Sequence, residues 1–332
     1  MIIETVQESD NSNNSKLLSI VMPVYNEEDN LQLAYDSICE VFKNQPYELE
    51  FIFTDNNSED ATFEKIQNIA ENDERVKALR FNRNYGFQRS LMTGYRLASG
   101  DAAIQIDCDL QDPPELILSF IELWQKGHDV VVGIRNRREE NYFLTKCRSL
   151  YYSFINYVSD DQITKDAGDF RLIDRKVLNK VININDNNPY VRGLTSAFAT
   201  NETGIHYDRK KRQYGESKFP FHKLVNLASD GIFSMTLFPL RLAGHISLVI
   251  TLITIAMSLY YLIAALFFGN DWPDGFATLV LLLLFSISLN STLLAILGKY
   301  LGQIFLQQQN RPIVVVECAI NLDGQSDKIE KQ

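Results

Sequence analysis

The first half of this 332-residue chain predicts a doubly wound α/β fold, a parallel sheet covered by helices on both faces. Short apolar runs typical of strands alternate with longer segments of helical periodicity. Polar and acidic residues follow the strands directly, and ligands of such sheets bind at the carboxyl ends of the strands. The second half adds two long uncharged segments. The sequence therefore predicts a ligand-binding α/β domain followed by membrane helices.

The predicted elements alternate regularly along the chain. Strands are expected over residues 17–25, 49–55, 76–81, 102–107 and 129–134. Helices are expected over residues 28–43, from Ser58 onward, over 86–99 and over 114–126. Ser58 is expected to cap the second helix, and the acidic residues after it suit the positive end of the helix dipole.

Composition and charge exclude several classes of protein. Apolar residues make up 45% and charged residues 22% of the chain, which excludes a disordered or wholly membrane-embedded protein. The net charge of −10 argues against general nucleic-acid binding. The four cysteines form no C-x-x-C pair, which disfavours a zinc site or a disulfide framework and suits a reducing compartment. Residues 1–16 are polar and acidic, so we expect a disordered tail rather than a signal peptide.

The second half predicts a transmembrane hairpin. Residues 242–268 and 276–298 contain no Asp, Glu, Lys or Arg, and each exceeds the roughly 20 residues that cross a bilayer core. The link between them is short and lacks Lys and Arg, whereas basic residues flank the pair on the outside. The positive-inside rule therefore places both ends in the cytoplasm. Two buried helices of a soluble protein are the weaker alternative.

Two further segments combine basic and aromatic residues in an amphipathic pattern. Residues 141–159 and 219–240 have this composition, which is typical of helices lying in the membrane interface. For the first, an ordinary core-facing helix is an equal alternative. The expected organisation is a tail (1–16), a cytoplasmic α/β domain (17–218), a juxtamembrane helix (219–241), two spans (242–268 and 276–298) and a cytoplasmic strand and tail (299–332).

Acidic residues crowd the end of the fourth predicted strand. Asp107, Asp109 and Gln111 stand at i, i+2 and i+4, so on a continuing strand they share one face. Such hard oxygen ligands suit Mg²⁺ or Mn²⁺ bound together with phosphates. A bare D-x-D is common and is more often a solvated loop, but the position at a strand end favours the cation site.

The first two predicted strands also end in polar residues. Asp55 ends the second strand, where its carboxylate can accept hydrogen bonds from a base or ribose, cap a turn, or do both. Tyr25 and Glu27 follow the first strand, where they can stack on a base and accept from a sugar hydroxyl. Taken alone, that segment is an ordinary polar loop.

These three segments together resemble a known family. PVYNE (23–27), DNNS (55–58) and DCDLQDPPE (107–115), in this order and spacing, resemble the nucleotide-sugar-binding domain of family 2 glycosyltransferases, which has the GT-A fold. Asn56 departs from the family, which usually has a second Asp there. The later segments GIRNRREE, AGDFRLIDRKV, RQYGESKF and NRPIVVV, with the hairpin, resemble the polyprenyl-phosphate glycosyltransferases. That group includes dolichyl-phosphate mannose synthase and the bactoprenol glucosyltransferases, and the resemblance covers about residues 17–316.

The resemblance implies a role for each motif residue. Asp55 would contact the nucleobase, and the nucleotide pocket would be lined by Pro23, Tyr25 and Glu27. Asp107, Asp109 and Gln111 would bind the metal and diphosphate. The phosphates would be handled by Arg135, Arg212 and Lys218, whereas residues 209–211 read mainly as a basic patch for anionic lipid. Asp169 would be either a base or acceptor-positioning group, or a structural partner of Arg171 or Arg175.

The implied activity is inverting, metal-dependent transfer of a sugar, with UDP-glucose the leading donor, to undecaprenyl phosphate at the cytoplasmic face of the bacterial inner membrane. The resemblance implies a homotetramer, and the strand 313–316 could pair with a neighbour's sheet edge. A processive polysaccharide synthase is disfavoured, since it needs more spans and usually a Q-x-x-R-W motif. A non-catalytic membrane scaffold is disfavoured by the intact acidic segment and the Gly-Glu-Ser-Lys loop.

Overall fold

The computed structural model describes residues 15–136, 167–184, 186, 189–209, 275–308 and 312–322, with isolated positions between 240 and 263. The chain divides into two compact units. The first comprises Met1–Glu140, Ile163–Ser217 and Pro312–Gln332, and the second comprises Asn141–Gln162 and Lys218–Arg311.

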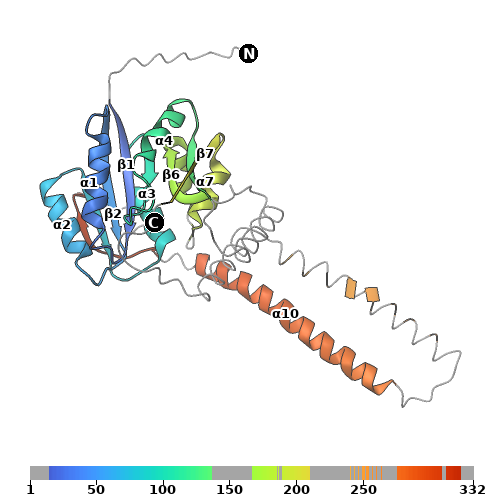
Figure 1. Ribbon diagram of the computed structural model, residues 1–332. Helices are drawn as coiled ribbons and strands as arrows, with labels where there is room; N and C mark the ends of the chain where they lie inside the picture. Colours follow the sequence, from blue (N-terminus) through green and yellow to red (C-terminus); the bar gives the residue numbers. More distant parts are fainter. Residues whose placement is uncertain are drawn as a thin grey trace, which may run out of the picture. The chain divides into compact units, whose positions relative to one another are not determined.

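The first unit is an α/β domain built on an eight-stranded sheet (Figure 1). Its strands are β1 (Lys16–Val24), β2 (Tyr47–Asp55), β3 (Val76–Phe81), β4 (Ala102–Gln105), β5 (Val130–Arg135), β6 (Ala167–Asp174), β7 (Glu202–Tyr207) and β8 (Val316–Ile320). Its helices are α1 (Leu31–Phe42), α2 (Thr62–Asn72), α3 (Phe87–Leu97), α4 (Leu116–Gln125), α6 (Arg175–Ile182) and α7 (Val191–Phe198). All five predicted strands and all four predicted helices of the first half are confirmed, and all except β3 have shifted ends.

The sheet is mixed rather than wholly parallel. Its strand order is β7-β5-β6-β4-β1-β2-β3-β8. β1 runs parallel to β2 and β4, and β2 runs parallel to β3. β6 inserts antiparallel between β4 and β5, and β8 adds antiparallel to β3 at the edge. The five strands predicted in the first half all run in one direction, since β6 is antiparallel to both β4 and β5. The two antiparallel strands, β6 and β8, come from later in the chain.

Helices cover both faces of the sheet. α1, α2 and α4 pack their apolar residues into one core, which includes Leu31, Ile66 and Phe120. α3, α6 and α7 pack into the core on the other face, which includes Met92 and Val177. Burial of these continuous apolar strands between two helical layers is the main favourable contribution to folding of the domain. The resulting three layers leave the sheet's strand ends as the places where polar side chains gather.

The segment before β8 packs against the α/β domain of its own chain. Ile313 and Val314 are 4% and 1% exposed and belong to the core of the α/β domain. Val316 pairs with Phe81 of β3. The expectation that the strand 313–316 extends a neighbour's sheet is therefore wrong for these described residues, because this chain's own third strand takes the pairing.

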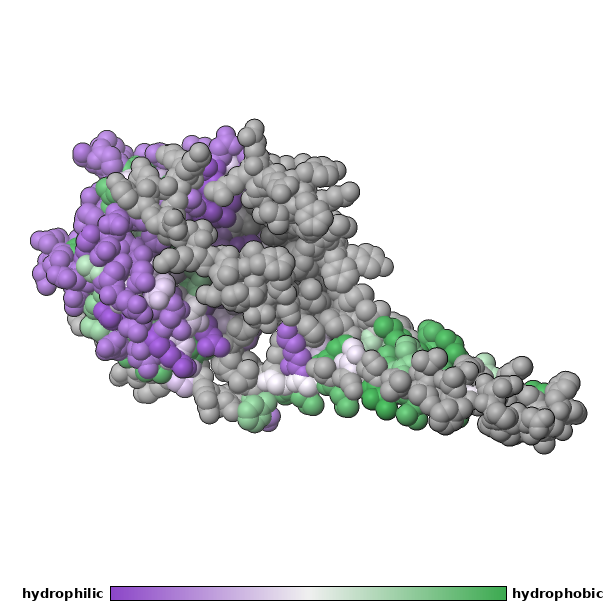
Figure 2. Space-filling model, turned by 60° about the horizontal axis from the view of Figure 1, so that its bottom comes forward, coloured by the Kyte–Doolittle hydropathy of each residue, from purple (hydrophilic) through white to green (hydrophobic). Residues whose placement is uncertain are grey.

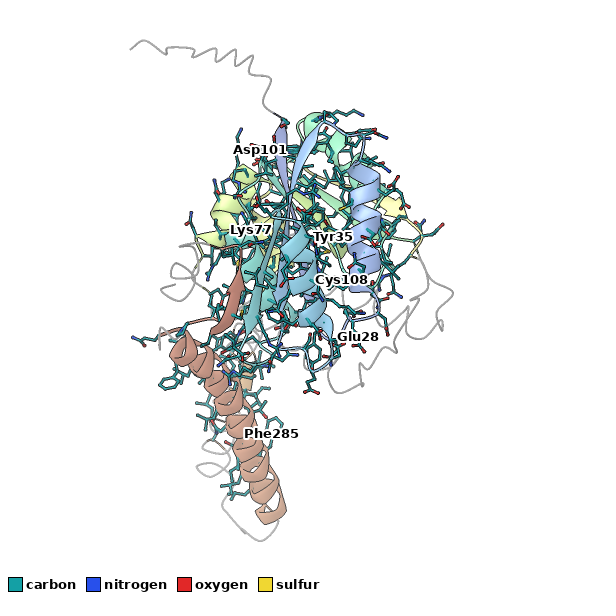
Figure 3. All side chains as sticks on the ribbon, turned by 90° about the vertical axis from the view of Figure 1, so that its left-hand side faces the viewer. Glu28, Tyr35, Lys77, Asp101, Cys108 and Phe285 are labelled. Carbon is teal, nitrogen blue, oxygen red and sulfur yellow. The ribbon has the colours of Figure 1, made fainter. Side chains whose placement is uncertain are left out.

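The second unit contains helix α10 (Phe276–Gln308), which is 33 residues long and includes the second predicted span. Many of its described apolar side chains are exposed, among them Leu283, Phe285 and Leu294 (Figure 2, green; Phe285 is labelled in Figure 3). Within the part of the chain that the structure describes, no helix has the joint length and apolarity of a membrane span. The first predicted span and the predicted interfacial helices at 141–159 and 219–240 lie outside the described residues, apart from isolated positions.

Candidate active site

The polar strand ends gather at one edge of the sheet, the carboxyl ends of the parallel strands. In Figure 3, Asp101 precedes β4 at one end of the domain, and Cys108 follows β4 at the other. Glu28, which follows β1, lies at the same end as Cys108. Asp55 ends β2 beside Val24 of β1, so all three sequence motifs lie at the edge where α/β sheets bind ligands.

The acidic segment forms a turn rather than a strand extension. β4 ends at Gln105, and Leu110 adopts the left-handed conformation with φ of 54°. The argument that Asp107, Asp109 and Gln111 share a strand face is therefore wrong, because regular strand geometry stops before them. The turn places them by hydrogen bonds instead. The Gln105 amide donates to Asp107 Oδ1 at 2.9 Å, and the Gln111 backbone N–H donates to Asp109 Oδ1 at 3.2 Å.

Asp112 is the buried carboxylate of this turn that several surrounding side chains contact. Its side chain is fully buried and accepts a hydrogen bond from the Tyr207 hydroxyl at the end of β7. Arg135, at the end of β5, lies 3.5 Å from Asp112 Oδ2 and donates to the Tyr207 hydroxyl from Nε. Gly168 packs against the same guanidinium, since a Cβ there would lie 3.1 Å from Arg135 Nε. Asp112 thus orients Arg135 beside the acidic turn.

Arg209 also faces the acidic turn, which corrects its interpretation as part of a lipid-binding patch. Its Nε lies 3.3 Å from Asp112 Oδ1, and its Nη2 lies 3.8 Å from Asp109 Oδ2. The reason is topological, because Arg209 comes directly after β7, whose end is tied to Asp112 through Tyr207. Arg212 and Lys218 lie outside the described residues.

The carboxylates of the turn repel one another. Burial, reinforced by the charges of Asp112, Asp169 and Asp109, raises the pKa of Asp107 to about 7. A divalent cation would relieve this repulsion. Among the described side chains, no group of three or more His, Cys, Asp or Glu is arranged to hold a metal ion by itself. The neighbouring carboxylates of Asp107 and Asp109 are hard oxygen ligands of the kind that hold a Mg²⁺-type cation together with phosphates.

We expect Asp107→Asn to stabilise the ligand-free protein at pH 8. The native-state pKa lies above the usual 3.8, so the ionised carboxylate costs stability as the pH rises from about 4 to 7. Removing this charge should raise the free energy of unfolding by on the order of 2–4 kcal/mol at pH 8, a melting-temperature gain of several degrees. The gain should shrink as the pH falls towards 5. Thermal melting in EDTA measures it, with Asp36→Asn on exposed α1 as control. An equal gain at both pH values would contradict the account.

The first strand end supplies an ordered loop beside the end of β2. Pro23 is buried within β1, whereas Tyr25 is 42% exposed. The backbone N–H of Glu27 donates to Thr62 Oγ1 at 2.9 Å, and the Glu27 carboxylate accepts from the Asn30 amide at 2.7 Å. The loop is thus tied to the start of α2, and the aromatic ring of Tyr25 is left accessible for stacking.

Asp55 has the turn-forming role expected of it. It is fully buried, and both its oxygens accept from the Ser58 backbone N–H, at 3.1 and 3.3 Å. Ser58 does not cap α2, which begins at Thr62; its hydroxyl accepts from the Asn26 backbone N–H instead. Burial raises the pKa of Asp55, against the hydrogen bonds from Ser58 and the charge of Arg80. Arg80 Nε lies 3.9 Å from Asp55 Oδ2.

Asp169 pairs with an arginine that sequence reasoning missed. Its carboxylate accepts from Arg192 Nη2 at 2.7 Å, from helix α7. The proposed partner Arg175 donates instead to the carbonyls of Gly100 and Ala98, and Arg171 donates to Thr195 and to the Gly168 carbonyl. Burial acts to raise the pKa of Asp169, but Arg192 and Arg171 outweigh it and the pKa is lowered. An anchored carboxylate of lowered pKa is a poor general base.

A double-mutant cycle separates the two readings of Asp169. If Asp169 acts through Arg192, Asp169→Asn should lower kcat about 10- to 100-fold, and the double variant with Arg192→Gln should be no slower than Arg192→Gln alone. If it is a general base, Asp169→Asn should cost as much in either background. Steady-state kinetics of the four proteins at pH 6 and 8 distinguish the two roles. We expect the same fold-decrease in kcat at both pH values because Asp169 stays ionised.

A family model and the sequence relatives identify the family of this chain. The family model "Glycosyl transferase family 2" matches residues 19–182. The chain is 36% identical to the bactoprenol glucosyl transferase of Shigella phage SfII, over 90% of this chain and 97% of that protein. It is 33% identical to the uncharacterized glycosyltransferase YkcC of Bacillus subtilis, over 92% of this chain and 95% of that protein.

Solved structures also match. Glucosyl-3-phosphoglycerate synthase from Mycobacterium tuberculosis, in complex with Mn²⁺, UDP-glucose and phosphoglyceric acid, is 17% identical, with a TM-score of 0.43 over 66% of this chain and 78% of that one. The mixed α/β sheet of the described residues is GT-A-like. From its sequence relatives and its matching domain, the chain belongs to glycosyltransferase family 2 and is a glycosyltransferase.

Proposed function

We propose that this protein transfers a sugar, with UDP-glucose the leading donor, to undecaprenyl phosphate, inverting the anomeric carbon. The observation that carries the proposal is 36% identity, over 90% of the chain, to a relative named bactoprenol glucosyl transferase. The acidic turn with two arginines at the carboxyl edge of the sheet supports it, because a nucleoside diphosphate donor needs both a cation and phosphate ligands.

The residues around the acidic turn would bind the cation and the phosphates of the donor. Asp107 and Asp109 would hold Mg²⁺ or Mn²⁺ with help from Gln111, and the cation supplies positive charge to the leaving diphosphate. Arg135, oriented by Asp112, would donate to phosphate oxygens with its planar fork. Arg212 and Lys218 would add further donors, an assignment that rests on the resemblance alone.

Two other groups of residues would hold the nucleoside and the acceptor. Asp55 and Glu27 would accept hydrogen bonds from the nucleoside, and Tyr25 would stack on the base next to Pro23. The acceptor phosphate is already anionic near neutral pH, so transfer needs no strong general base. The lowered pKa of Asp169 agrees with this, and we assign it the positioning of Arg192 near the acceptor.

The membrane and assembly parts of the proposal complete it. Residues 242–268 and 276–298 would form a hairpin in the bacterial inner membrane, with the catalytic domain on the cytoplasmic face. Support comes from the uncharged sequence and from the exposed apolar side chains of α10 (Figure 2). A lipid acceptor requires the site to work at a membrane surface. The homotetramer rests on the family resemblance alone.

The proposal is tested by a partition assay with purified protein in detergent. Undecaprenyl phosphate and Mn²⁺ are supplied with labelled UDP-glucose, UDP-galactose, UDP-N-acetylglucosamine or GDP-mannose, one at a time. Label should enter the organic phase with UDP-glucose and should stop with EDTA. Transfer with another donor would correct the sugar. No transfer from any donor, in protein that melts cooperatively, would contradict the proposed activity.

A further inference from the structure

Arg209 lies beside Asp109, one of the two carboxylates that would hold the proposed cation. Its guanidinium lies 3.8 Å from Asp109 and 3.3 Å from Asp112, and its side chain is only 18% exposed. At such distances and burial, a unit positive charge strongly disfavours a second cation on the same carboxylate. Arg209 and a divalent cation therefore compete for Asp109.

The guanidinium of Arg209 is held by charge more than by hydrogen bonds. Its Nε is buried, and no described group accepts a hydrogen bond from it, although Asp112 lies close enough for an ion pair. Asp112 does not depend on this pair for compensation, because Tyr207 and Arg135 also contact it. Arg209 can therefore turn away without leaving a buried carboxylate alone.

The backbone just before Arg209 is anchored by two hydrogen bonds. Tyr207, two residues earlier, is tied to Asp112, and the neighbouring Asp208 accepts from the Asn136 amide at 2.9 Å. A long side chain on a fixed backbone can change partner by rotating its own torsions. The planar fork of arginine matches phosphate oxygens as well as it matches carboxylates.

We propose that Arg209 is an internal counterion, which neutralises Asp109 in the ligand-free protein and moves to the donor's diphosphate when the divalent cation binds. This inference rests on the proposed function and deepens it. The exchange makes cation and nucleotide binding mutually reinforcing: the diphosphate removes Arg209 from the cation site, and the cation releases Arg209 for the diphosphate.

The test measures Mn²⁺ and UDP binding separately, by calorimetry on full-length protein in detergent. Without nucleotide, Arg209→Gln should bind Mn²⁺ about 5- to 10-fold more tightly than wild type, because a competing charge is gone. With Mn²⁺ saturating, the same variant should bind UDP about 5- to 10-fold more weakly. Lys126→Gln, which removes the same charge from an exposed site at the C-terminal end of α4, should change neither.

Arg209→Lys keeps the test decisive if Arg209→Gln fails to melt cooperatively. Lysine keeps the positive charge but lacks the planar guanidinium that binds two phosphate oxygens at once. Mn²⁺ affinity without UDP should therefore stay within about twofold of wild type, and UDP affinity should fall. Unchanged or weaker Mn²⁺ binding in Arg209→Gln, or unchanged UDP binding in Arg209→Lys, would overturn the inference. Wild-type protein that binds no Mn²⁺ even with UDP would overturn the proposed function as well, which separates the two failures.

Discussion

Asp109→Asn should remove nearly all sugar transfer, lowering kcat by a factor on the order of 10³ while the protein stays folded. Asp109 is one of the two carboxylates of the acidic turn that face Arg209, and its oxygen accepts a hydrogen bond from the Gln111 backbone N–H. The amide keeps the size of the side chain but loses the negative charge that a divalent cation needs. Loss of a cation that stabilises the leaving diphosphate costs several kcal/mol of the barrier.

The measurement is initial-rate transfer at saturating donor over a wide range of Mn²⁺. Asp36→Asn, an equal charge change on the exposed face of α1, is the matched control and should keep wild-type turnover. Near-normal turnover of Asp109→Asn would show that the cation site has been placed on the wrong residue. A loss fully restored by high Mn²⁺ would instead show that Asp109 contributes to affinity alone.

Asp112→Asn should have the largest effect on stability. Asp112 is fully buried and faces two guanidinium groups, those of Arg135 and Arg209. Without its charge Arg135 loses its ion pair with Asp112, and Arg209 keeps the longer contact with Asp109. Removing one partner of a buried ion pair typically costs about 3–5 kcal/mol. We expect the melting temperature to fall by on the order of 10 °C, and transfer to fall with it because both arginines lose their orientation.

Thermal melting and transfer rates on the same samples check this expectation. Glu115→Gln is the control, since it removes a nearby acidic charge at an exposed position. An Asp112→Asn protein with the melting temperature and the transfer rate of wild type would contradict the role of Asp112 in holding Arg135 and Arg209. Impaired transfer with unchanged melting would restrict its role to orienting Arg135 and Arg209.

Local pattern was sufficient to predict the strands and helices of the first half. Continuous apolar runs such as β1 and β2 can be buried only between two layers, so their alternation with helices predicts the layered fold. The insertion of β6 between β4 and β5 has no local signal, because strand order depends on pairing between distant segments. For the same reason β8 could not be assigned to β3 from its sequence.

In the candidate site, too, local sequence predicted some features and tertiary contacts determined the others. Asp107, Asp109 and Asp55 could be found because acids directly after buried strands are unusual. The geometry of these residues could not be predicted from the sequence. The turn begins at the end of β4, and Leu110 adopts a left-handed conformation that the spacing of the acids does not indicate. Partners supplied by tertiary contact were missed, namely Arg192 for Asp169 and Tyr207 and Arg209 for Asp112.

The central claim, transfer of a hexose to a polyprenyl phosphate, is tested most directly by the mass of the lipid product. Purified protein is incubated with undecaprenyl phosphate, UDP-glucose and Mn²⁺, and the organic extract and the released UDP are both quantified. The account predicts undecaprenyl phosphate heavier by one hexose, formed in equal amount to UDP, and absent with Asp109→Asn. UDP released with free glucose and an unchanged lipid would contradict it.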